Sequence, residues 1–450
     1  MIYQNRIKYA DNKPVNLAGE YVLYWMEHSQ RIKENTSLAY AIDSANKYNK
    51  PILVLFVLNP YSPYHNNRHF QYMLQGLSLL RKNLFAGGIQ LHLDVGLPVD
   101  YVLEHSLKAV EVVGDVGYLR EERRTRETLK TKLKVPFTLI ESEVIVPVEF
   151  ASDKEEYNAR TIRGKLKDKV PLFLDKIEIP EVKVHSLDLE IKNSFSFYPP
   201  TGEFSKKLMI NHNVKSVSYP SGEKWAYNTT KVFLTNGLSS YKMGKNLVAD
   251  GYQSGLSPFL HYGQISPKRI ANLAKEESSE NVEVFLEQLI VRRELAYNFV
   301  WYNQKYDSFE SLPDWAKKTL LEHSIDDRPY LYTHDQLESA ETHDKYWNAA
   351  MKELLITGMM NGYMRMYWGK KILEWVADPV EAYSIALHLN NIYGIDGFNP
   401  NSYAGIAWCF GMHDRPWKTR DVFGSVRYMN AQGLERKYDM EAYLEYVDKL

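Results

Sequence analysis

Cysteine is almost absent from this sequence of 450 residues, which contains only Cys409. A single thiol excludes a disulfide framework, a zinc site built from several cysteines and a cysteine-ligated iron–sulfur cluster. It also favours a reducing, cytoplasmic setting. We assign no chemistry to Cys409, and we expect no metal site.

The sequence also lacks long hydrophobic runs. Its most apolar segment covers residues 51–58, far fewer than the ~20 residues that cross a bilayer. The N-terminus turns polar at once, without the apolar region of a signal peptide. We therefore expect a soluble protein without a membrane partner, and a buried strand at 51–58.

The sequence also lacks an excess of charge of either sign. Its 55 Lys and Arg residues nearly balance its 56 Asp and Glu residues, which gives a formal net charge of −1. Without a protein-wide basic field, any binding of nucleic acid needs a local patch. Neither Gly-rich phosphate loops of the Walker and dinucleotide types nor a His-Glu-x-x-His motif occurs. The usual kinase and hydrolase interpretations thereby lose their main support.

Aromatic side chains, in contrast, are abundant, with 9 Trp, 33 Tyr and 17 Phe. The hydrophobic fraction of 44% and the charged fraction of 25% are ordinary for a globular protein, so a sizeable core is feasible. At about 150 residues per domain, the length indicates two large domains or three smaller ones.

Residues 1–165 alternate between strand-like and helix-like patterns. Short apolar runs predict strands at 21–26, 51–58, 89–93 and 110–115, and periodic apolar positions predict helices at 29–48, 72–84 and 99–106. The run at 89–93 alternates apolar and polar residues, which is typical of a half-buried strand. This order predicts an α/β domain with a Rossmann-like parallel sheet and helices on both faces.

The rest of the chain falls into two regions. Residues 166–220 are rich in proline, lysine and glutamate, and we expect a long linker that is partly ordered against a neighbour. Residues 221–450 show mainly helical periodicity, which predicts an all-α domain. Within it we expect a long helix at 282–301 and a helical stretch at 347–375 that breaks near Gly358.

Residues 362–371 combine Arg365 with methionines and aromatic residues. A core helix is the simpler interpretation, since apolar stripes at helical spacing are common. A buried arginine, however, needs a carboxylate partner, and Asp396 in the later loop 390–397 is a candidate.

Three tryptophans of the same region allow two interpretations. Trp368 and Trp375 are seven positions apart, so they lie on one helix face about 10 Å apart, and Trp347 precedes them in the sequence. Such a set is most often core packing. Indole is also oxidisable, so the three could pass electrons, and the pattern alone leaves both interpretations open.

A basic segment follows near the C-terminus. Trp408 and Trp417 flank a His-Asp-Arg triplet, and residues 411–437 hold six Lys and Arg against three acids. Aromatic residues among local positive charges suit a nucleic-acid backbone with a stacked base. Taken alone, the segment fits a solvated surface turn at least as well.

Several long segments resemble the class II cyclobutane pyrimidine dimer photolyases of the photolyase/cryptochrome superfamily. The matching segments are 24–31, 256–264, 292–295, 342–344, 363–375, 395–397, 413–415 and 427–429. They keep the family's order over nearly the whole chain. The resemblance implies an α/β antenna domain (1–165), a linker (166–220) and a helical FAD-binding domain (221–450). It implies that excited, reduced FAD donates one electron to a thymine dimer in DNA and so splits it.

The resemblance also implies roles for individual residues at the cofactor. It assigns FAD binding to Tyr241, Gly255, Leu256, Ser257, Arg365, Asn390, Asp396 and Gly397. Arg365 and Asp396 are expected to pair beside the isoalloxazine ring, and Asn390 to face its N5 edge. Trp368, Trp347 and Trp375 are expected to form the photoreduction chain, with Trp368 nearest the flavin.

At the DNA lesion the resemblance assigns Lys245, Asn246, Arg292, Met366, Trp408, Arg415 and Arg427. Three positions depart from some members of the family. Gln288 stands in the catalytic site where they carry a glutamic acid, so it can donate a hydrogen bond but cannot deliver a proton. Arg292 stands where some members carry a second tryptophan, and Lys245 where some carry arginine.

These departures leave two hypotheses in which light acts, beside a third, a flavin protein with no light role, which would need the three tryptophans to be core packing only. The first is light-driven repair of cyclobutane pyrimidine dimers, and the alternative is a cryptochrome-like blue-light photoreceptor with weak or no repair activity. Both imply FAD, with an antenna chromophore of the 8-hydroxy-5-deazaflavin type or none. The repair hypothesis implies damaged DNA as the partner of a monomer, which is nucleoid-associated in a prokaryote and nuclear in a eukaryote.

Overall fold

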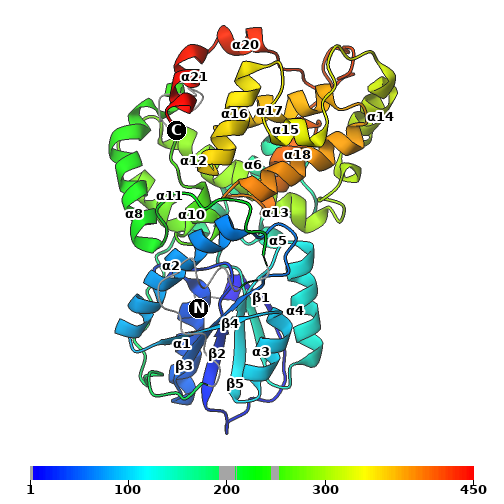
Figure 1. The fold of residues 1–450 in the computed structure, drawn as a ribbon. Coiled ribbons are helices and arrows are strands. Elements are labelled where there is room, and N and C mark those ends of the chain that lie inside the picture. The colour runs from blue at the N-terminus through cyan, green and yellow to red at the C-terminus, as the bar shows by residue number, and fades with distance from the viewer. Residues whose placement is uncertain (1–3, 192–207, 209, 245–252) are drawn as a thin grey trace.

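The computed structural model describes residues 4–191, 208, 210–244 and 253–450, and these form two stacked parts (Figure 1). The lower part in that view holds a six-stranded sheet in the order β1-β6-β5-β2-β3-β4. Its strands are β1 (Ile7–Ala10), β2 (Tyr21–Trp25), β3 (Ile52–Leu58), β4 (Gln90–Val95), β5 (Ala109–Asp115) and β6 (Phe137–Ile140). All neighbouring pairs are parallel except β1 with β6. The predicted Rossmann-like sheet is confirmed, with an added antiparallel edge strand.

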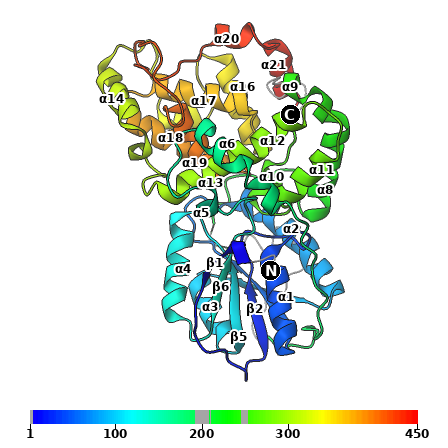
Figure 2. The same cartoon turned by 180° about the vertical axis from the view of Figure 1, so that it is seen from behind.

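Helices cover both faces of the sheet, as predicted (Figures 1 and 2). Helices α1 (Thr36–Tyr48) and α2 (Asn67–Ala86) pack on one face, where every second residue of β2 and β3 joins their apolar core. Helices α3 (Pro98–Ser106) and α4 (Arg120–Lys132) cover the opposite face. Because both faces are buried, the central strands are apolar throughout, as parallel strands usually are.

Two of these helices differ in length from the sequence prediction. The predicted helix at 29–48 begins only at Thr36, because the Asn35 side chain accepts the Leu38 N–H and caps the helix there. The helix predicted at 72–84 begins already at Asn67 and ends at Ala86. Helix starts depend on capping contacts, which apolar periodicity does not report.

Strand β4 is buried more deeply than its alternating pattern predicted. His92 and Asp94 are 1% and 2% exposed. In the pairing of β3 with β4, His92 lies opposite Leu55 and Asp94 lies opposite Val57. Leu55 and Val57 belong to the core on the face that α3 and α4 cover. The prediction of a half-buried strand is therefore wrong, because α3 closes the face on which the polar residues lie.

The upper part is helical throughout the residues that the structure describes. Two short helices, α5 (Val148–Ala151) and α6 (Ala159–Lys167), lead into it from the sheet. It then contains α8 (Glu223–Val232), α9 (Tyr241–Gly244), α10 (Ser257–His261), α11 (Pro267–Lys275), α12 (Val282–Leu286), α13 (Arg293–Tyr302), α14 (Asp314–Glu322) and α15 (His334–Glu338). It ends with α16 (Lys345–Thr357), α17 (Gly362–Trp375), α18 (Pro379–Tyr393), α19 (Pro400–Cys409), α20 (Ala431–Glu435) and α21 (Met440–Asp448).

The described residues also contain short 3₁₀ and π-helical turns. The 3₁₀ turns are η1 (Gln4–Arg6), η2 (Val170–Phe173), η4 (Leu238–Ser240), η6 (Phe309–Ser311) and η7 (His323–Ile325). The π turns are η3 (Phe233–Gly237) and η5 (Glu287–Arg292). None of the helices in the described ranges is long and apolar enough to cross a membrane.

Both long helical predictions in this part are confirmed. The stretch at 282–301 is continuously helical, although η5 widens it in the middle. The stretch at 347–375 is split into α16 and α17, as the glycine predicted. Gly358 ends α16 with a φ of +72°, a left-handed value that a residue without Cβ adopts at little cost.

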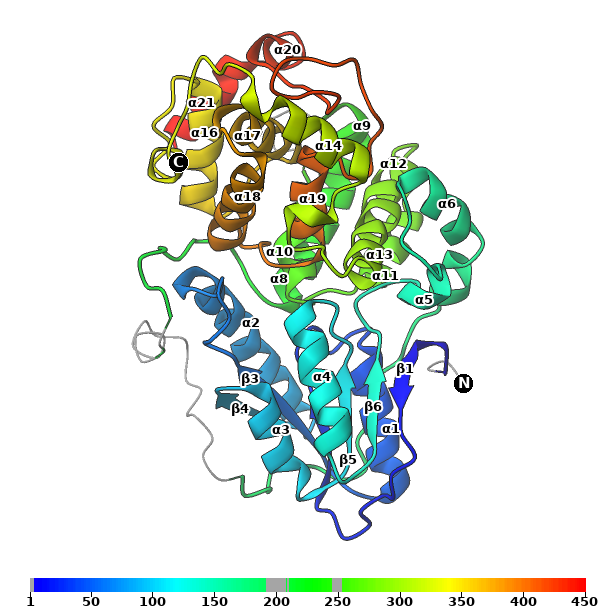
Figure 3. The same cartoon turned by 90° about the vertical axis from the view of Figure 1, so that its right-hand side faces the viewer.

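The part of residues 166–220 that the structure describes runs back along the sheet. Lys183 N–H donates to the Asn46 side chain at 2.8 Å, and Ser186 N–H donates to the Gly88 carbonyl at 2.9 Å. Figure 3 shows this segment descending beside the lower part. Backbone hydrogen bonds therefore hold the segment to the α/β part before the chain returns to the helices.

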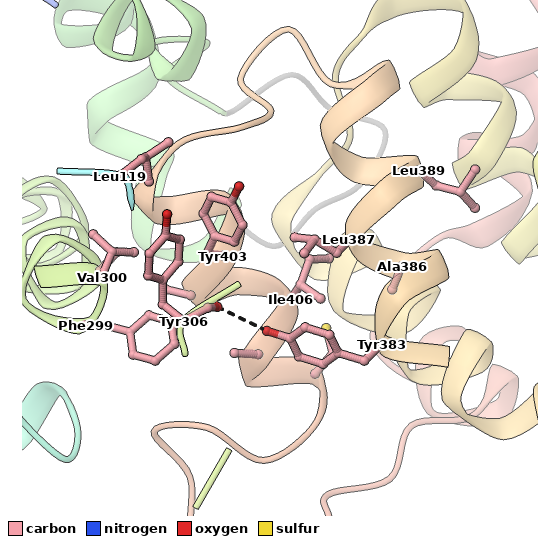
Figure 4. Packing of buried hydrophobic residues seen from close by; sticks show 14 of the residues in the cluster. Leu119, Phe299, Val300, Tyr306, Tyr383, Ala386, Leu387, Leu389, Tyr403 and Ile406 are labelled. Carbon is pink, nitrogen blue, oxygen red and sulfur yellow. Dashed lines mark hydrogen bonds between the residues drawn. The ribbon is translucent and has the colours of Figure 1, made fainter. Parts of the chain in front are cut away.

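Many aromatic residues fill the core around α13, α18 and α19 (Figure 4). The rings of Tyr306 and Tyr403 meet edge to face with centroids 4.8 Å apart, and the Tyr383 hydroxyl donates to the Tyr306 carbonyl at 3.5 Å. The Tyr306 hydroxyl in turn accepts the Arg120 N–H at 2.8 Å. Since Arg120 begins α4, this core also ties the sheet part to the helices.

A second contact between the parts lies at the carboxyl ends of β2 and β5. The Asp115 carboxylate ends β5 and accepts the backbone N–H groups of Glu27, His28 and Ser29, each at 3.1 Å. This turn presents Arg31, whose Nη1 donates to the Gly263 carbonyl at 2.9 Å. The motif at 24–31 therefore acts as the joint between the sheet and the helical part.

Candidate active site

A cavity of about 810 Å³ opens in the helical part. Its walls come from α9, α10, η5, α13, α17, α19 and the loop after α18. Such a volume is within the range of ~300–1,000 Å³ that is usual for ligand pockets. The predicted site residues that line it are Tyr241, Gly255, Leu256, Ser257, Gln288, Arg292, Arg365, Met366, Asp396, Trp408 and Arg427.

One wall is the tight turn that leads into α10. Gly255 has a φ of +63°, and a Cβ there would lie 2.8 Å from the Tyr219 hydroxyl oxygen. That hydroxyl donates to the Gly255 carbonyl at 2.6 Å. Glycine is required because both the φ value and the close hydroxyl disfavour a side chain. The turn brings Ser257, the first residue of α10, to the cavity.

An ion pair lies against the cavity from two separate elements. Arg365 of α17 donates from Nη2 to Asp396 Oδ1 at 3.2 Å, as the sequence predicted. Helix α17 is positioned by Asn361, whose side chain accepts the Tyr363 N–H and caps the helix. Burial raises the pKa of Asp396, but Arg365 and the Ser257 hydroxyl outweigh it and hold the pKa below its ordinary value. The carboxylate is therefore ionised near neutral pH.

Arg293 and Tyr297 are cavity residues that the sequence analysis did not single out. Arg293 is buried, donates from Nη2 to the Tyr297 hydroxyl at 2.9 Å and leaves Nη1 without a partner. The Tyr297 hydroxyl donates to Glu143 at 2.9 Å. Arg293 lines the cavity with a buried positive charge, and such a charge is stabilised by a nearby anion, so the cavity is suited to an anionic group. The arginine pair in the motif at 292–295 was the available signal.

The opposite wall combines an indole with a guanidinium. Arg292 places its guanidinium carbon 4.8 Å from the centroid of the Trp408 ring, a cation–π contact. Glu287 lies 3.5 Å from Arg292 Nε and accepts two hydrogen bonds from Arg163 of α6, at 2.7 and 3.0 Å. Arg163 and Glu287 therefore hold Arg292 over the Trp408 face.

The π turn η5 decides which side chains reach this wall. Gln288 and Arg292 line the cavity, whereas Glu287 turns away toward Arg163. Consecutive helical residues point in different directions, so Glu287 does not take the place of Gln288 at this wall. A π turn in the middle of a helix is frequent at functional sites.

The three tryptophans form a buried series, with Trp347 in its middle. The Trp347 ring lies parallel to that of Trp368, with centroids 6.4 Å apart, and edge-on to that of Trp375 at 5.6 Å. The Trp347 indole N–H donates to the Trp368 carbonyl at 3.0 Å. Trp368 stands close to the cavity in sequence, since Arg365 and Met366 of the same helix line it.

A basic loop lies beside the cavity mouth. Trp417 is exposed, and the guanidinium carbons of Arg415 and Arg427 lie 5.6 and 5.0 Å from its ring centroid. The Trp417 indole N–H is 3.3 Å from the Asp414 carboxylate, which orients the ring. Trp417 is thus a further member of the surface that the sequence assigned to Arg415 and Arg427.

Some predicted residues are not brought to the cavity. Asn390 and Gly397 are not among the described residues that line it, and Asn390 donates its amide N–H to Asn391 at 3.2 Å. Arg415 belongs to the loop outside. The assignments of Lys245 and Asn246 fall outside the described residues.

Two solved structures share this fold. A cryptochrome of Synechocystis matches with a TM-score of 0.75 and 17% identity, over 95% of this chain and 88% of its own. An archaeal photolyase of Sulfolobus tokodaii, solved with two FAD molecules, matches with a TM-score of 0.72 and 16% identity, over 95% of this chain and 89% of its own. The fold is therefore of the photolyase/cryptochrome class.

Sequence comparison narrows this class to a family. The family model for DNA photolyase matches residues 22–181. The deoxyribodipyrimidine photo-lyase of Methanothermobacter thermautotrophicus is 44% identical over 100% of this chain and 99% of its own length. The chain therefore belongs to the DNA photolyase family of enzymes.

Proposed function

We propose that this enzyme binds FAD in the helical cavity and repairs cyclobutane pyrimidine dimers in DNA when it is illuminated. The observation that carries this proposal is the cavity itself. It joins an Arg365–Asp396 pair, a wall of Trp408 and Gln288 and a basic mouth at Arg427. The residues 24–31 and 256–264, which carry much of the resemblance to class II photolyases, form the joint and the turn that shape it.

The cavity suits FAD in chemistry as well as in size. Arg293 lines the cavity with a buried guanidinium, and a diphosphate oxygen is a strong acceptor for such a group. Tyr241 and Ser257 add hydroxyl groups. Reduced FAD, when bound and excited by blue or near-UV light, supplies the electron that splits the dimer and takes it back afterwards.

The protein's own residues supply position and charge. Asp396 keeps Arg365 fixed beside the cavity, so that its guanidinium favours negative charge there. Trp408 and Met366 offer a polarisable surface to the two linked pyrimidines of a dimer that has left the DNA stack. Gln288 donates a hydrogen bond to the lesion. Arg415 and Arg427 contact the phosphates around it.

The proposal is tested with the full chain carrying photoreduced FAD and an oligonucleotide with one thymine dimer. We expect chromatography to show restored thymines under blue light and none in the dark. Trp408→Ala should lower binding of the damaged strand, since stacking on an aromatic ring contributes about 1–3 kcal/mol per base. Trp225→Ala, on the exposed surface of α8, is the matched control. Intact dimers after illumination of the wild-type protein would overturn the proposal.

The alternative function, a blue-light photoreceptor, has one specific observation in its favour. Gln288, which lines the cavity, cannot deliver a proton to the dimer. We expect Gln288→Glu to raise the quantum yield of repair. Efficient repair by the wild-type chain removes the reason for the photoreceptor hypothesis.

The proposal also includes a site for an antenna chromophore. The α/β part, residues 1–165, is the place for it, and residues 221–450 then form the FAD-binding part. An absorption spectrum of the purified protein distinguishes the three cases: an 8-hydroxy-5-deazaflavin adds a band of its own, a second flavin doubles the flavin absorbance per chain, and an empty antenna site leaves the spectrum of FAD alone.

A further inference from the structure

Two polar residues interrupt an apolar face of the sheet, far from the cavity. His92 and Asp94 of β4 are next-but-one neighbours, so they lie on the same face of the strand. The residues beside them on β3, Leu55 and Val57, belong to the apolar core under α3 and α4. Polar groups in such a place need partners.

A third side chain meets them from α3. His105 Nε2 lies 2.7 Å from Asp94 Oδ2, and His92 Nε2 lies 3.2 Å from the same oxygen. The two imidazole rings meet edge to face with centroids 4.9 Å apart. Each of the three residues offers one possible ligand atom, a ring nitrogen or a carboxylate oxygen, and these three atoms lie within 4.8 Å of one another.

The hydrogen bonds in this cluster leave His92 unsatisfied. Asp94 accepts a hydrogen bond from His105, but neither ring nitrogen of His92 makes a hydrogen bond, although both are buried. An imidazole nitrogen without a hydrogen is a metal ligand. His92 thus lies 3.2 Å from the shared carboxylate without a well-aligned hydrogen bond to it among the described residues, an arrangement that suits side chains grouped around a common ion.

We propose that His92, Asp94 and His105 bind one divalent transition metal ion of the zinc class. Two imidazoles and one carboxylate are a common zinc ligand set. Tetrahedral zinc separates such ligand atoms by roughly 3.3 Å, and the distances of 2.7 and 3.2 Å to Asp94 lie close to that separation. A water molecule would complete the coordination.

The position of the cluster indicates a structural ion rather than a catalytic one. The metal would join α3 to β4, the edge strand of the sheet; both elements are labelled in Figure 1. The backbone of His105 is already held, because the Tyr21 hydroxyl donates to its carbonyl at 2.9 Å. The His105 side chain retains 9% exposure, which leaves the ion a short path from solvent.

Metal binding to the full chain tests this inference independently of repair. After removal of metal with a chelator, Zn²⁺ should bind at one equivalent per chain and raise the melting temperature. Co²⁺ should give the visible absorption bands of a tetrahedral site. Asp94→Asn and His105→Gln should each weaken zinc binding more than about 100-fold, since loss of an outer partner alone weakens it by about 10–100-fold.

His334→Gln is the matched control, because it removes the other His/Asp/Glu cluster among the described residues, which is more exposed. It should leave the cobalt spectrum unchanged. The inference is overturned if wild-type protein shows no cobalt bands and no zinc-dependent stabilisation, or if Asp94→Asn and His105→Gln leave both unchanged. In those cases the cluster is a hydrogen-bonded triad only. If either variant fails to fold, the wild-type measurements still test the inference. His92→Phe, which keeps a ring but removes the ligand nitrogen, then serves as the variant.

Discussion

At the scale of single residues, the arrangement of the tryptophans matters more than their number. Trp347 lies between Trp368 and Trp375 in space, although both follow it in the sequence. Beyond Trp375 the rings of Tyr332 and His343, each 5.3 Å from it, continue toward exposed Tyr330. Aromatic contacts of this kind are compatible with core packing, yet they also connect the cavity side of α17 to the surface.

A substitution of Trp347 separates these two roles. We expect Trp347→Phe to fold and to bind FAD but to lose nearly all photoreduction, because the middle member of the series is no longer an indole. Repair after chemical reduction should be retained. The measurement is the rate of flavin bleaching under blue light with an external reductant.

The control for this experiment is Trp225→Phe on α8, which is 48% exposed and outside the series. It should photoreduce like the wild-type protein. An unchanged rate in Trp347→Phe would mean that the three tryptophans only pack the core.

At the scale of elements, side chains set where helices meet. Glu353 of α16 is buried and accepts a hydrogen bond from the Tyr443 hydroxyl of α21 at 2.6 Å. Burial raises the pKa of Glu353 to about 7, although Tyr443 and Arg365 act in the opposite direction. The contact of the last helix with α16 therefore depends on pH.

The sign of this dependence follows from proton linkage. The folded protein keeps a proton on Glu353 that the unfolded chain releases near its ordinary pKa, so stability falls as pH rises from about 5 to about 7. Glu353 contributes up to about 3 kcal/mol to this fall. We expect Glu353→Gln to flatten the profile, as measured by urea unfolding at both pH values.

Glu445→Gln, on the exposed side of α21, is the control and should leave the profile unchanged. If Glu353→Gln has the same pH profile as the wild-type protein, Glu353 is not protonated in the folded state. The contact with Tyr443 then has a charged acceptor.

At the scale of the whole molecule, the backbone of the helical part lies in direct contact with the backbone of the sheet part. Gly263, after α10, has a φ of +61°, and a Cβ there would collide with the His28 carbonyl oxygen. The same residue accepts the hydrogen bond from buried Arg31. The joint between sheet and helices therefore requires glycine.

We expect Gly263→Ala to destabilise the protein by about 3 kcal/mol or more, because strain and a clash with backbone both oppose the side chain. Gly164→Ala is the matched control. Gly164 lies inside α6 and a Cβ there meets nothing within 4 Å, so alanine should stabilise by about 0.5–1 kcal/mol. Thermal unfolding measures both. Equal melting temperatures for the two variants would contradict the role of Gly263 in the joint.

Local patterns predicted much of this fold because they report local physics. The strands β2, β3 and β5 are apolar runs, and α16 and α17 separate at Gly358, as their residues predicted. Strands β1 and β6 were missed, since each has only four residues and is held by pairing with strands distant in the sequence. Burial of His92 was missed because it depends on α3, which alternation along β4 does not report.

The sequence by itself determined the α/β and helical regions and, through resemblance, the partners Arg365 and Asp396. Only the tertiary structure decided that Arg292 lies over Trp408, that buried Arg293 lines the cavity, and that His92, Asp94 and His105 converge. The physical reason is distance along the chain. Helical and strand periods act over a few residues, whereas these contacts depend on elements that meet only after the sheet and the helices have packed.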